Sequence, residues 1–132
     1  MITISAPHSQ ARLTGTQMYI DTGPGVAKFA LYATPRVAID VLPMSAAVVE
    51  IPLSVPCGTV SSNGLALTQG DDGLIMTTAV VQWARLFNRS GDTVADFDIR
   101  ADTDPVENGE LSITSTTLYA GGIARLTSAH LT

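Results

Sequence analysis

Apolar and polar residues alternate over short runs along most of this chain, which is the period of β-strands. The clearest example is residues 79–100, in which two apolar-rich runs of strand length flank a turn at residues 89–92. Turn residues between two such runs predict a β-hairpin. The hairpin holds the only tryptophan, Trp83, together with Phe87 and Phe97. Because aromatic side chains bury large apolar areas, we expect this hairpin to supply the centre of the core.

The two strands of the hairpin differ in how their faces are composed. In the first strand the set Val81, Trp83, Arg85 and Phe87 alternates with the set Val80, Gln82, Ala84 and Leu86. Both sets are largely apolar, which predicts a central strand covered on both sides. In the second strand Phe97 and Ile99 face the core, while Val94, Asp96, Asp98 and Arg100 point the other way. We expect that second face to meet solvent or a partner.

The same alternation predicts further strands, with turn residues between them. They fall at residues 1–5, 27–33, 37–42, 46–53, 65–67, 110–120 and 122–131. In the run at 27–33, Phe29 and Leu31 alternate with Lys28, Ala30 and Tyr32, as in a half-buried strand. Asn63-Gly64 and Gly121-Gly122 are both two-residue hairpin connections. Prolines at positions 35, 43, 52 and 56 cannot donate to a ladder, so they belong at strand ends or on an edge strand. We therefore expect the region from 33 to 56 to be an irregular rim of the sheet.

The first 25 residues allow more than one structure. Residues 1–5 read either as a short strand ended by Pro7 or as an extended arm lying on a neighbouring subunit. Residues 9–21 allow a helix capped at Ser9, although Gly15 between two threonines disfavours it. A short helix is favoured slightly over a strand for that segment.

About eight short strands at spacings near ten residues predict an all-β, β-rich fold. The architecture expected is an antiparallel β-sandwich or a jelly-roll-like fold, with room for one short N-terminal helix. No internal repeat and no linker divides the chain. We therefore expect residues 1–132 to form a single β-sandwich domain with an N-terminal arm at about 1–8.

Charge and composition exclude several classes of partner. The net charge is −5, and the basic residues are Lys28 and six scattered arginines, so no cluster can neutralise several phosphates and no nucleic-acid partner is expected. No apolar stretch approaches bilayer length and no signal peptide is evident, so we expect neither membrane insertion nor secretion by the usual route. Charged residues make up only 14% of the chain. Such a surface fits either contact with another chain or a β-fold rich in small turn residues.

No residue is predicted to be catalytic, to bind a cofactor or to hold a metal ion. His8 and His130 lie near the termini without a nucleophile motif around any serine. The single cysteine, Cys57, cannot form an intramolecular disulfide, and no basic residue lies near it to activate it. Asp96 and Asp98 could form a glycosidase pair, but a solvated stripe on one strand face is the favoured interpretation. The protein is therefore expected not to be an enzyme.

Two acidic loops raise the question of calcium. The first is at residues 71–72 and the second at 102–110, which carries Asp102, Asp104, Glu107 and Glu110. Two carboxylates fall short of the six to eight oxygens that calcium takes, and Pro105 departs from the EF-hand pattern. Solvated loop acids are favoured in both places, and metal binding stays open.

The order of these features resembles that of small virion structural proteins of tailed bacteriophages. Those proteins combine an A-R-L segment running to I-D-x-G, a K-x-x-L-Y strand, a central tryptophan strand before a G-x-x-V turn, and a terminal G-G hairpin. The matching residues here are Ala11-Arg12-Leu13, Ile20-Asp21-Thr22-Gly23, Lys28 to Tyr32, Val81 to Phe87, Gly91 to Val94, and Ser112 to Leu126. The resemblance spans residues 11 to 130. The chain departs from it between 33 and 60, where four prolines replace loops rich in alanine and glycine.

The resemblance implies a non-enzymatic protein of the virion, made in the host cytoplasm and assembled in many copies. The leading expectation is a capsid decoration or cement protein that stabilises the shell through subunit contacts. Its partners would be the major capsid protein, other virion proteins and further copies of itself as a homo-oligomer. Candidate contact regions are the arm at 1–8 and the rim at 33–56. The alternative is a module of the tail or tail fibre that binds host-surface glycan through Tyr19, Tyr32 or Tyr119.

Overall fold

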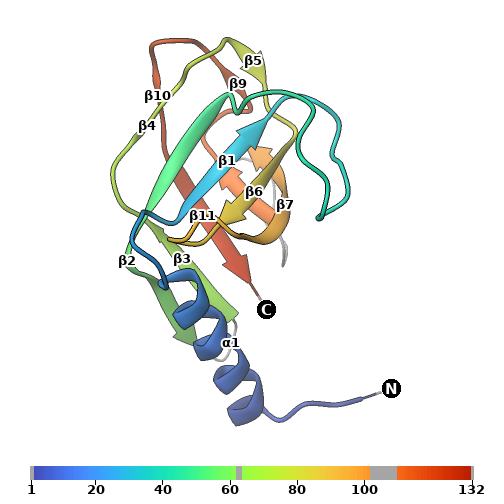
Figure 1. Ribbon diagram of the computed structural model, residues 1–132, viewed down its shortest axis with the longest axis vertical. Helices are drawn as coiled ribbons and strands as arrows, with labels where there is room; N and C mark the ends of the chain where they lie inside the picture. Colours follow the sequence, from blue (N-terminus) through green and yellow to red (C-terminus); the bar gives the residue numbers. More distant parts are fainter. Residues whose placement is uncertain (1, 62–63, 102–109, 132) are drawn as a thin grey trace.

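Seven strands pair edge to edge until the sheet closes on itself as a barrel, in the order β1-β2-β3-β11-β8-β7-β6 (Figure 1). The computed structural model describes residues 2–61, 64–101 and 110–131. The elements are α1 (Ala6–Ile20), β1 (Lys28–Tyr32), β2 (Val49–Ser61), β3 (Gly64–Gln69), β4 (Gly73–Leu74), β5 (Ala79–Val80), β6 (Trp83–Phe87), β7 (Thr93–Ala101), β8 (Glu110–Ile113), β9 (Thr117–Leu118), β10 (Ile123–Ala124) and β11 (Leu126–Leu131).

The prediction of a β-rich fold is confirmed, but the structure is a barrel and not a sandwich. β1 closes the sheet because it pairs on both sides, so that Phe29 lies opposite Ile51 of β2 and opposite Leu86 of β6. All of the barrel ladders are antiparallel except that between β7 and β8, which is parallel. Alternation along a strand reports which face is buried. It does not report whether a second sheet or the same sheet covers that face.

The barrel interior is filled by one alternating set from each strand. Phe29 and Leu31 of β1 point inward, as do Leu86 of β6 and Phe97 of β7, and all four are fully buried. Phe29 and Phe97 meet edge to face, with ring centroids 5.2 Å apart. The two faces predicted for β1 are therefore confirmed, because Ala30 and Tyr32 belong to a separate cluster outside the barrel.

The hairpin predicted over 79–100 is present as β6 and β7, which pair antiparallel, but it begins only at Trp83, because residues 79–80 form β5 and pair with β9. Trp83 is 1% exposed, but it lies on the outside of the barrel with Ala30 and Tyr32. The expectation that this tryptophan occupies the centre of the core is therefore wrong. It forms a second, smaller apolar layer, and Phe87 packs against that layer from a half-buried position.

A helix precedes the barrel and begins earlier than the sequence suggested. α1 starts at Ala6, and its cap is Ser5, whose hydroxyl accepts a hydrogen bond from the His8 amide at 3.4 Å. The predicted cap at Ser9 is wrong, because Pro7 is accommodated in the first turn, where no amide hydrogen is needed. The arm is correspondingly shorter than predicted, with residues 2–5 outside the helix.

The helix lies against the ends of β2 and β3 that project below the barrel (Figure 1). Leu13 and Ile20 are its two buried residues. Gln17 donates from its side-chain amide to the Gly58 carbonyl of β2. After the helix, the Asp21 carboxylate accepts a hydrogen bond from the Cys57 amide at 3.0 Å. These contacts fix the C-terminal half of α1 to the barrel.

Residues 33–48 form a loop without strands, which we call the strap. The strand predicted at 37–42 is therefore wrong. Two predicted proline positions also differ, since Pro52 and Pro56 lie inside β2 and not at an edge. β2 pairs with β1 through Val49–Pro52, and then with β3 mainly through Gly58–Ser61, with a register shift between Leu53 and Gly58. Pro56 falls in that shift, where no ladder bond is lost.

Two small ladders cap the upper end of the barrel, β4 with β10 and β5 with β9 (Figure 1). The predicted Gly121-Gly122 hairpin is therefore wrong, because the strands on either side of this turn pair with β5 and β4 instead of with each other. The hairpin predicted near Asn63-Gly64 is present as β2 and β3, with residue 63 itself outside the described residues. Within the described part of the chain, no helix is long and apolar enough to cross a bilayer.

Candidate interaction surfaces

The strap is fastened to the outside of the barrel by one buried ion pair. Arg85 of β6 lies opposite Asp96 of β7 in the strand register, and the two side chains are 3% and 4% exposed. Arg85 Nε donates to Asp96 Oδ1 at 2.8 Å and Nη2 donates to Oδ2 at 3.1 Å. The hydrogen bonds that the Asp96 carboxylate accepts from Arg85 hold the pKa of the guanidinium above its usual value.

The same guanidinium reaches two carbonyl oxygens of the strap. Nη1 donates to the Val41 carbonyl at 2.7 Å, and Nη2 donates to the Ala38 carbonyl at 3.1 Å. The Val41 amide in turn donates to the Ala38 carbonyl at 2.9 Å, which closes a tight turn. Arg85 therefore fixes the strap from beneath through its backbone and leaves the side chains of the turn free to face outward.

An aromatic pair fills the space beneath the first part of the strap. Tyr32 and Trp83 stack with centroids 4.7 Å apart, and the Arg85 guanidinium lies 5.2 Å from the Trp83 ring centroid. Trp83 Nε1 donates to the Thr34 carbonyl at 2.9 Å. Burial raises the pKa of the Tyr32 phenol. A second pair, Arg36 with Asp98 at 2.8 Å, joins the strap to β7 at an exposed position.

The outer surface of the strap carries several exposed apolar side chains. Its exposed large side chains and their exposed fractions are Ile39 45%, Val41 50%, Leu42 86% and Met44 72%. Exposed apolar side chains on a loop whose backbone is held in place are typical of a contact surface, because little further conformational freedom is lost when a partner binds. The strap lies within the predicted rim at 33–56.

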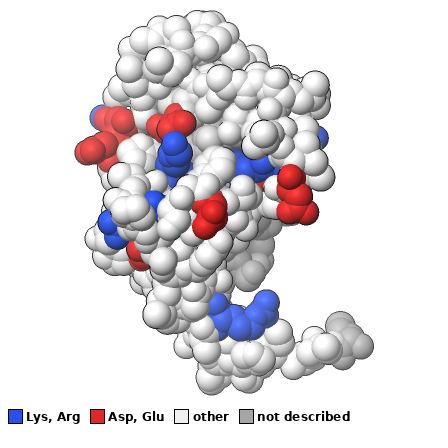
Figure 2. All heavy atoms as spheres, viewed as in Figure 1, with Lys and Arg blue, Asp and Glu red and all other residues white. Residues whose placement is uncertain are grey.

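Charged side chains are distributed unevenly over the face of the molecule shown in Figure 2. They gather across the middle of the barrel, with a further basic group near the helix, and the upper end is uncharged in this view. Among the exposed ion pairs, Lys28 contacts Glu50 at 2.7 Å and Arg125 contacts Asp72 at 2.9 Å. Asp72 of the first acidic loop is therefore paired with an arginine side chain, which lowers the pKa of its carboxyl group.

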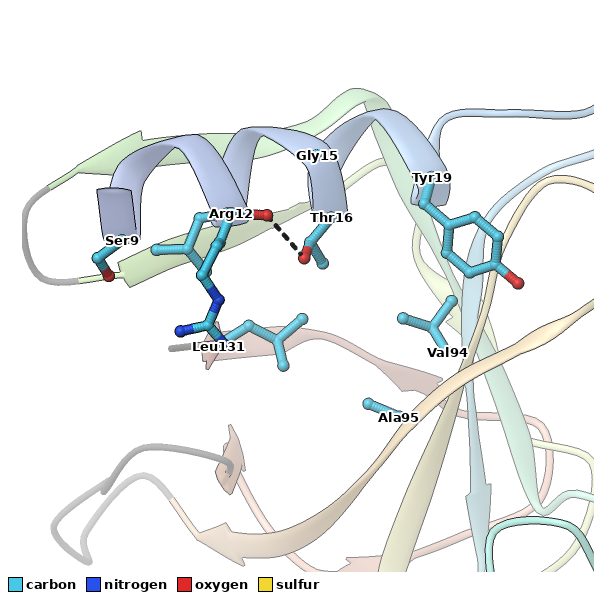
Figure 3. Close-up of a pocket in the computed structure, with 9 residues that line it drawn as sticks. Ser9, Arg12, Gly15, Thr16, Tyr19, Val94, Ala95 and Leu131 are labelled. Carbon is cyan, nitrogen blue, oxygen red and sulfur yellow. Dashed lines mark hydrogen bonds between the residues drawn. The ribbon is translucent and has the colours of Figure 1, made fainter. Parts of the chain in front are cut away.

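A groove of about 580 Å³ lies between one side of α1 and the barrel (Figure 3). The helix contributes Ser9, Arg12, Leu13, Gly15, Thr16 and Tyr19, and the opposite wall is Val94, Ala95 and Leu131. Arg12 is exposed and has no ion pair within the described residues. Beyond the groove the arm carries Ile2 and Ile4, which are 88% and 38% exposed. The groove thus combines an apolar floor with an arginine, two hydroxyls and a tyrosine.

The structure does not gather the residues that the sequence analysis weighed for catalysis. His8 is in the first turn of α1, Cys57 is in β2 and His130 is in β11. Burial raises the pKa of the Cys57 thiol to about 12, with Asp21 adding to the effect. Asp96 is buried against Arg85 and does not fit the solvated stripe that was favoured, whereas Asp98 is 64% exposed and fits it while pairing with Arg36. Within the described residues no group of three or more metal-ligating side chains occurs, and residues 102–109 lie outside them.

Arg85 is the functional residue that sequence reasoning did not single out. It was assigned to a largely apolar strand face without a role. The available signal was an arginine beside Trp83 on a strand covered on both sides, with an aspartate at the matching position of the return strand. A buried arginine needs a carboxylate and carbonyl partners, and that requirement points to a covering loop.

No protein-family model, no curated protein and no solved structure matches this chain. The resemblance to virion proteins therefore depends only on the residues quoted for it above.

Proposed function

We propose that this protein is a non-enzymatic structural protein of a tailed-bacteriophage virion, acting as a capsid decoration or cement protein. Its partners are the major capsid protein or other virion proteins, and it acts in the assembled particle after synthesis in the host cytoplasm. The observation that carries the proposal is the strap. Its backbone is fixed from below by Arg85, and its outer side chains are apolar and exposed.

The physical argument concerns what a shell contact requires. A decoration protein gains affinity when its contact surface is already ordered before binding, because less conformational entropy is then lost. Leu42 and Met44 project from a loop whose turn is held at Ala38 and Val41. The arm, with Ile2 and Ile4 exposed, offers a second apolar segment at the N-terminus. The location in a virion comes from the sequence resemblance.

The test is cosedimentation of the purified protein with empty shells assembled from the major capsid protein of the same phage. We expect the wild-type protein to bind, and Leu42→Asp with Met44→Asp to weaken binding at least about tenfold. Met18→Asp is the matched control, because Met18 is a similarly exposed residue, 67% open, on α1. A protein that stays monomeric and shows no affinity for the shells would refute the proposal.

The groove beside α1 supports the second candidate, a tail-associated module that binds host-surface glycan. Sugar sites combine an aromatic surface with hydroxyl and charged groups, and Tyr19, Arg12 and Thr16 line one groove. Tyr32 is buried against Trp83, so it is not accessible for this role. Glycan-array binding that is lost in Tyr19→Ala would favour this candidate. Silence on the array, together with shell binding, would remove it.

A further inference from the structure

The upper end of the molecule is a single two-stranded ribbon, residues 73–81 running against residues 116–124, which we call the ribbon lobe. Its two ladders are β4 with β10 and β5 with β9. Between the two ladders the Ile75 amide donates to the Gly122 carbonyl at 2.9 Å, and the Ala120 amide donates to the Thr78 hydroxyl. The two ladders therefore form one continuous ribbon, which fixes the positions of the side chains on its outer face relative to one another.

Both faces of this ribbon are apolar. The inner face closes the end of the barrel through Ile75, Leu118 and Ala124, which are 4%, 7% and 4% exposed. On the outer face Leu74 and Ile123 are directly opposite each other in the register, so their side chains lie together. One apolar face is enough to cover the end of the barrel, so the fold itself does not require the apolar side chains on the outer face.

The outer face carries five large apolar side chains, each more than half exposed. Their exposed fractions are Leu74 57%, Met76 67%, Val80 55%, Tyr119 66% and Ile123 56%. Together they leave about 500 Å² of side-chain surface open, which is in the range of the largest apolar patch on a small protein. Leu74 and Met76 also line a hollow of about 350 Å³ with Ala46, Ala47, Val49 and Glu50, whose carboxylate is paired with Lys28. The surface therefore has relief into which a partner side chain can pack.

The ribbon lobe contains no charged residue, since residues 73–81 and 116–124 include no lysine, arginine, aspartate or glutamate. The strap differs, because Arg36 and Asp40 lie within it. In a symmetric contact between two copies the same patch lies against itself, so charges of one sign would oppose each other. In a chain of net charge −5, an uncharged face is the one suited to self-contact.

We infer that the ribbon lobe is the contact between two copies of this chain, related by a twofold axis. Two patches of this size bury about 1,000 Å² in total, which is at the lower limit for specific interfaces. We therefore expect weak, reversible dimerisation, with a Kd on the order of micromolar. The strands of the lobe have two residues each. Their edges are too short to template open-ended pairing, so the contact closes as a dimer. This inference does not depend on the virion proposal.

The test is sedimentation velocity of the full chain from about 1 to about 300 μM, a range that spans the expected Kd. We expect a concentration-dependent monomer–dimer equilibrium that persists at about 1 M salt, because no charges contribute to the contact. Ile123→Glu should weaken the dimer at least about tenfold, since it places like charges in an apolar contact. Tyr119→Ser is the milder second variant, in case the first one disturbs folding.

Met44→Glu is the matched control, since it introduces the same charge at an exposed apolar site on the strap. It should leave the dimer unchanged, and all three variants should retain the far-ultraviolet circular dichroism of the wild type. A monomer over the whole concentration range would overturn the inference, even if the protein binds shells. Association that survives both lobe variants and is lost in Met44→Glu would also overturn it, and would assign self-contact to the strap.

Discussion

Replacing Arg85 with methionine tests whether the buried ion pair fastens the strap. Methionine retains most of the apolar stem but removes the guanidinium. The Asp96 carboxylate, 4% exposed, would then lack its partner, and the carbonyls of Ala38 and Val41 would each lose a donor. Breaking a buried pair in this way costs about 3–5 kcal/mol. That cost is a large share of the 5–15 kcal/mol by which domains are usually stable.

Urea unfolding measures this cost, and the chain provides its own probe. Trp83 is the only tryptophan, and it is stacked on Tyr32 beneath the strap. In Arg85→Met we expect a lower unfolding midpoint and a red-shifted Trp83 emission before the main transition, because the strap detaches first. Circular dichroism of the barrel should change only at the later step.

Arg36→Met is the matched control, because Arg36 pairs with Asp98 at the same junction but with side chains 45% and 64% exposed. Arg36→Met should lower the free energy of unfolding by less than about 1 kcal/mol. The double variant Arg85→Met with Asp96→Leu should recover most of the lost stability, since an apolar pair leaves no unpaired charge. If Arg85→Met is as stable as Arg36→Met and its emission is unchanged, the strap is held by something other than the ion pair.

Three further predictions follow from buried positions. Trp83→Ala should cost about 3–5 kcal/mol in urea unfolding; a loss under about 1 kcal/mol would contradict its burial. Gly58→Ala should destabilise by about 2 kcal/mol or more, because an added Cβ would lie 2.1 Å from the Ala66 carbonyl oxygen; unchanged stability would show that β2 can shift. Because the Cys57 pKa rises from an ordinary 9.0 to about 12, thiolate forms first in the unfolded state. Stability should therefore fall above pH 9 by up to about 1.4 kcal/mol per unit, and less steeply in Cys57→Ala.

The alternation of apolar and polar residues was sufficient to predict which face of a single strand is buried. β1 is the clearest case, because Phe29 and Leu31 entered the barrel while Ala30 and Tyr32 faced outward, as predicted. The sheet closes because β1 pairs with both β2 and β6, and nothing in the sequence of β1 indicates that it has these two partners. The sandwich prediction was wrong for this reason.

The strap shows the opposite case, in which a distant residue overrides a local pattern. Residues 37–42 alternate like a strand, but the carbonyls of Ala38 and Val41 accept hydrogen bonds from Arg85, more than 40 positions away. The burial of Trp83 was predicted correctly. Its place outside the barrel was not, because the layer that covers it is this loop. The arm and rim were predicted as contact regions, and this stays a prediction; both carry exposed apolar side chains.

The position of β11 in the barrel affects how the protein is made. β11 lies between β3 and β8, yet it is the last described strand in the chain. Gln69 at the end of β3 and Leu126 at the start of β11 are 57 residues apart, which a ribosome takes roughly 3–11 s to synthesise. During that interval the edge of β3 that later pairs with β11 has no partner, and Leu65 and Leu67 are not yet covered by β11. Yield during expression should therefore be limited by chains that aggregate before β11 emerges, and slower growth at low temperature with added chaperone should raise it.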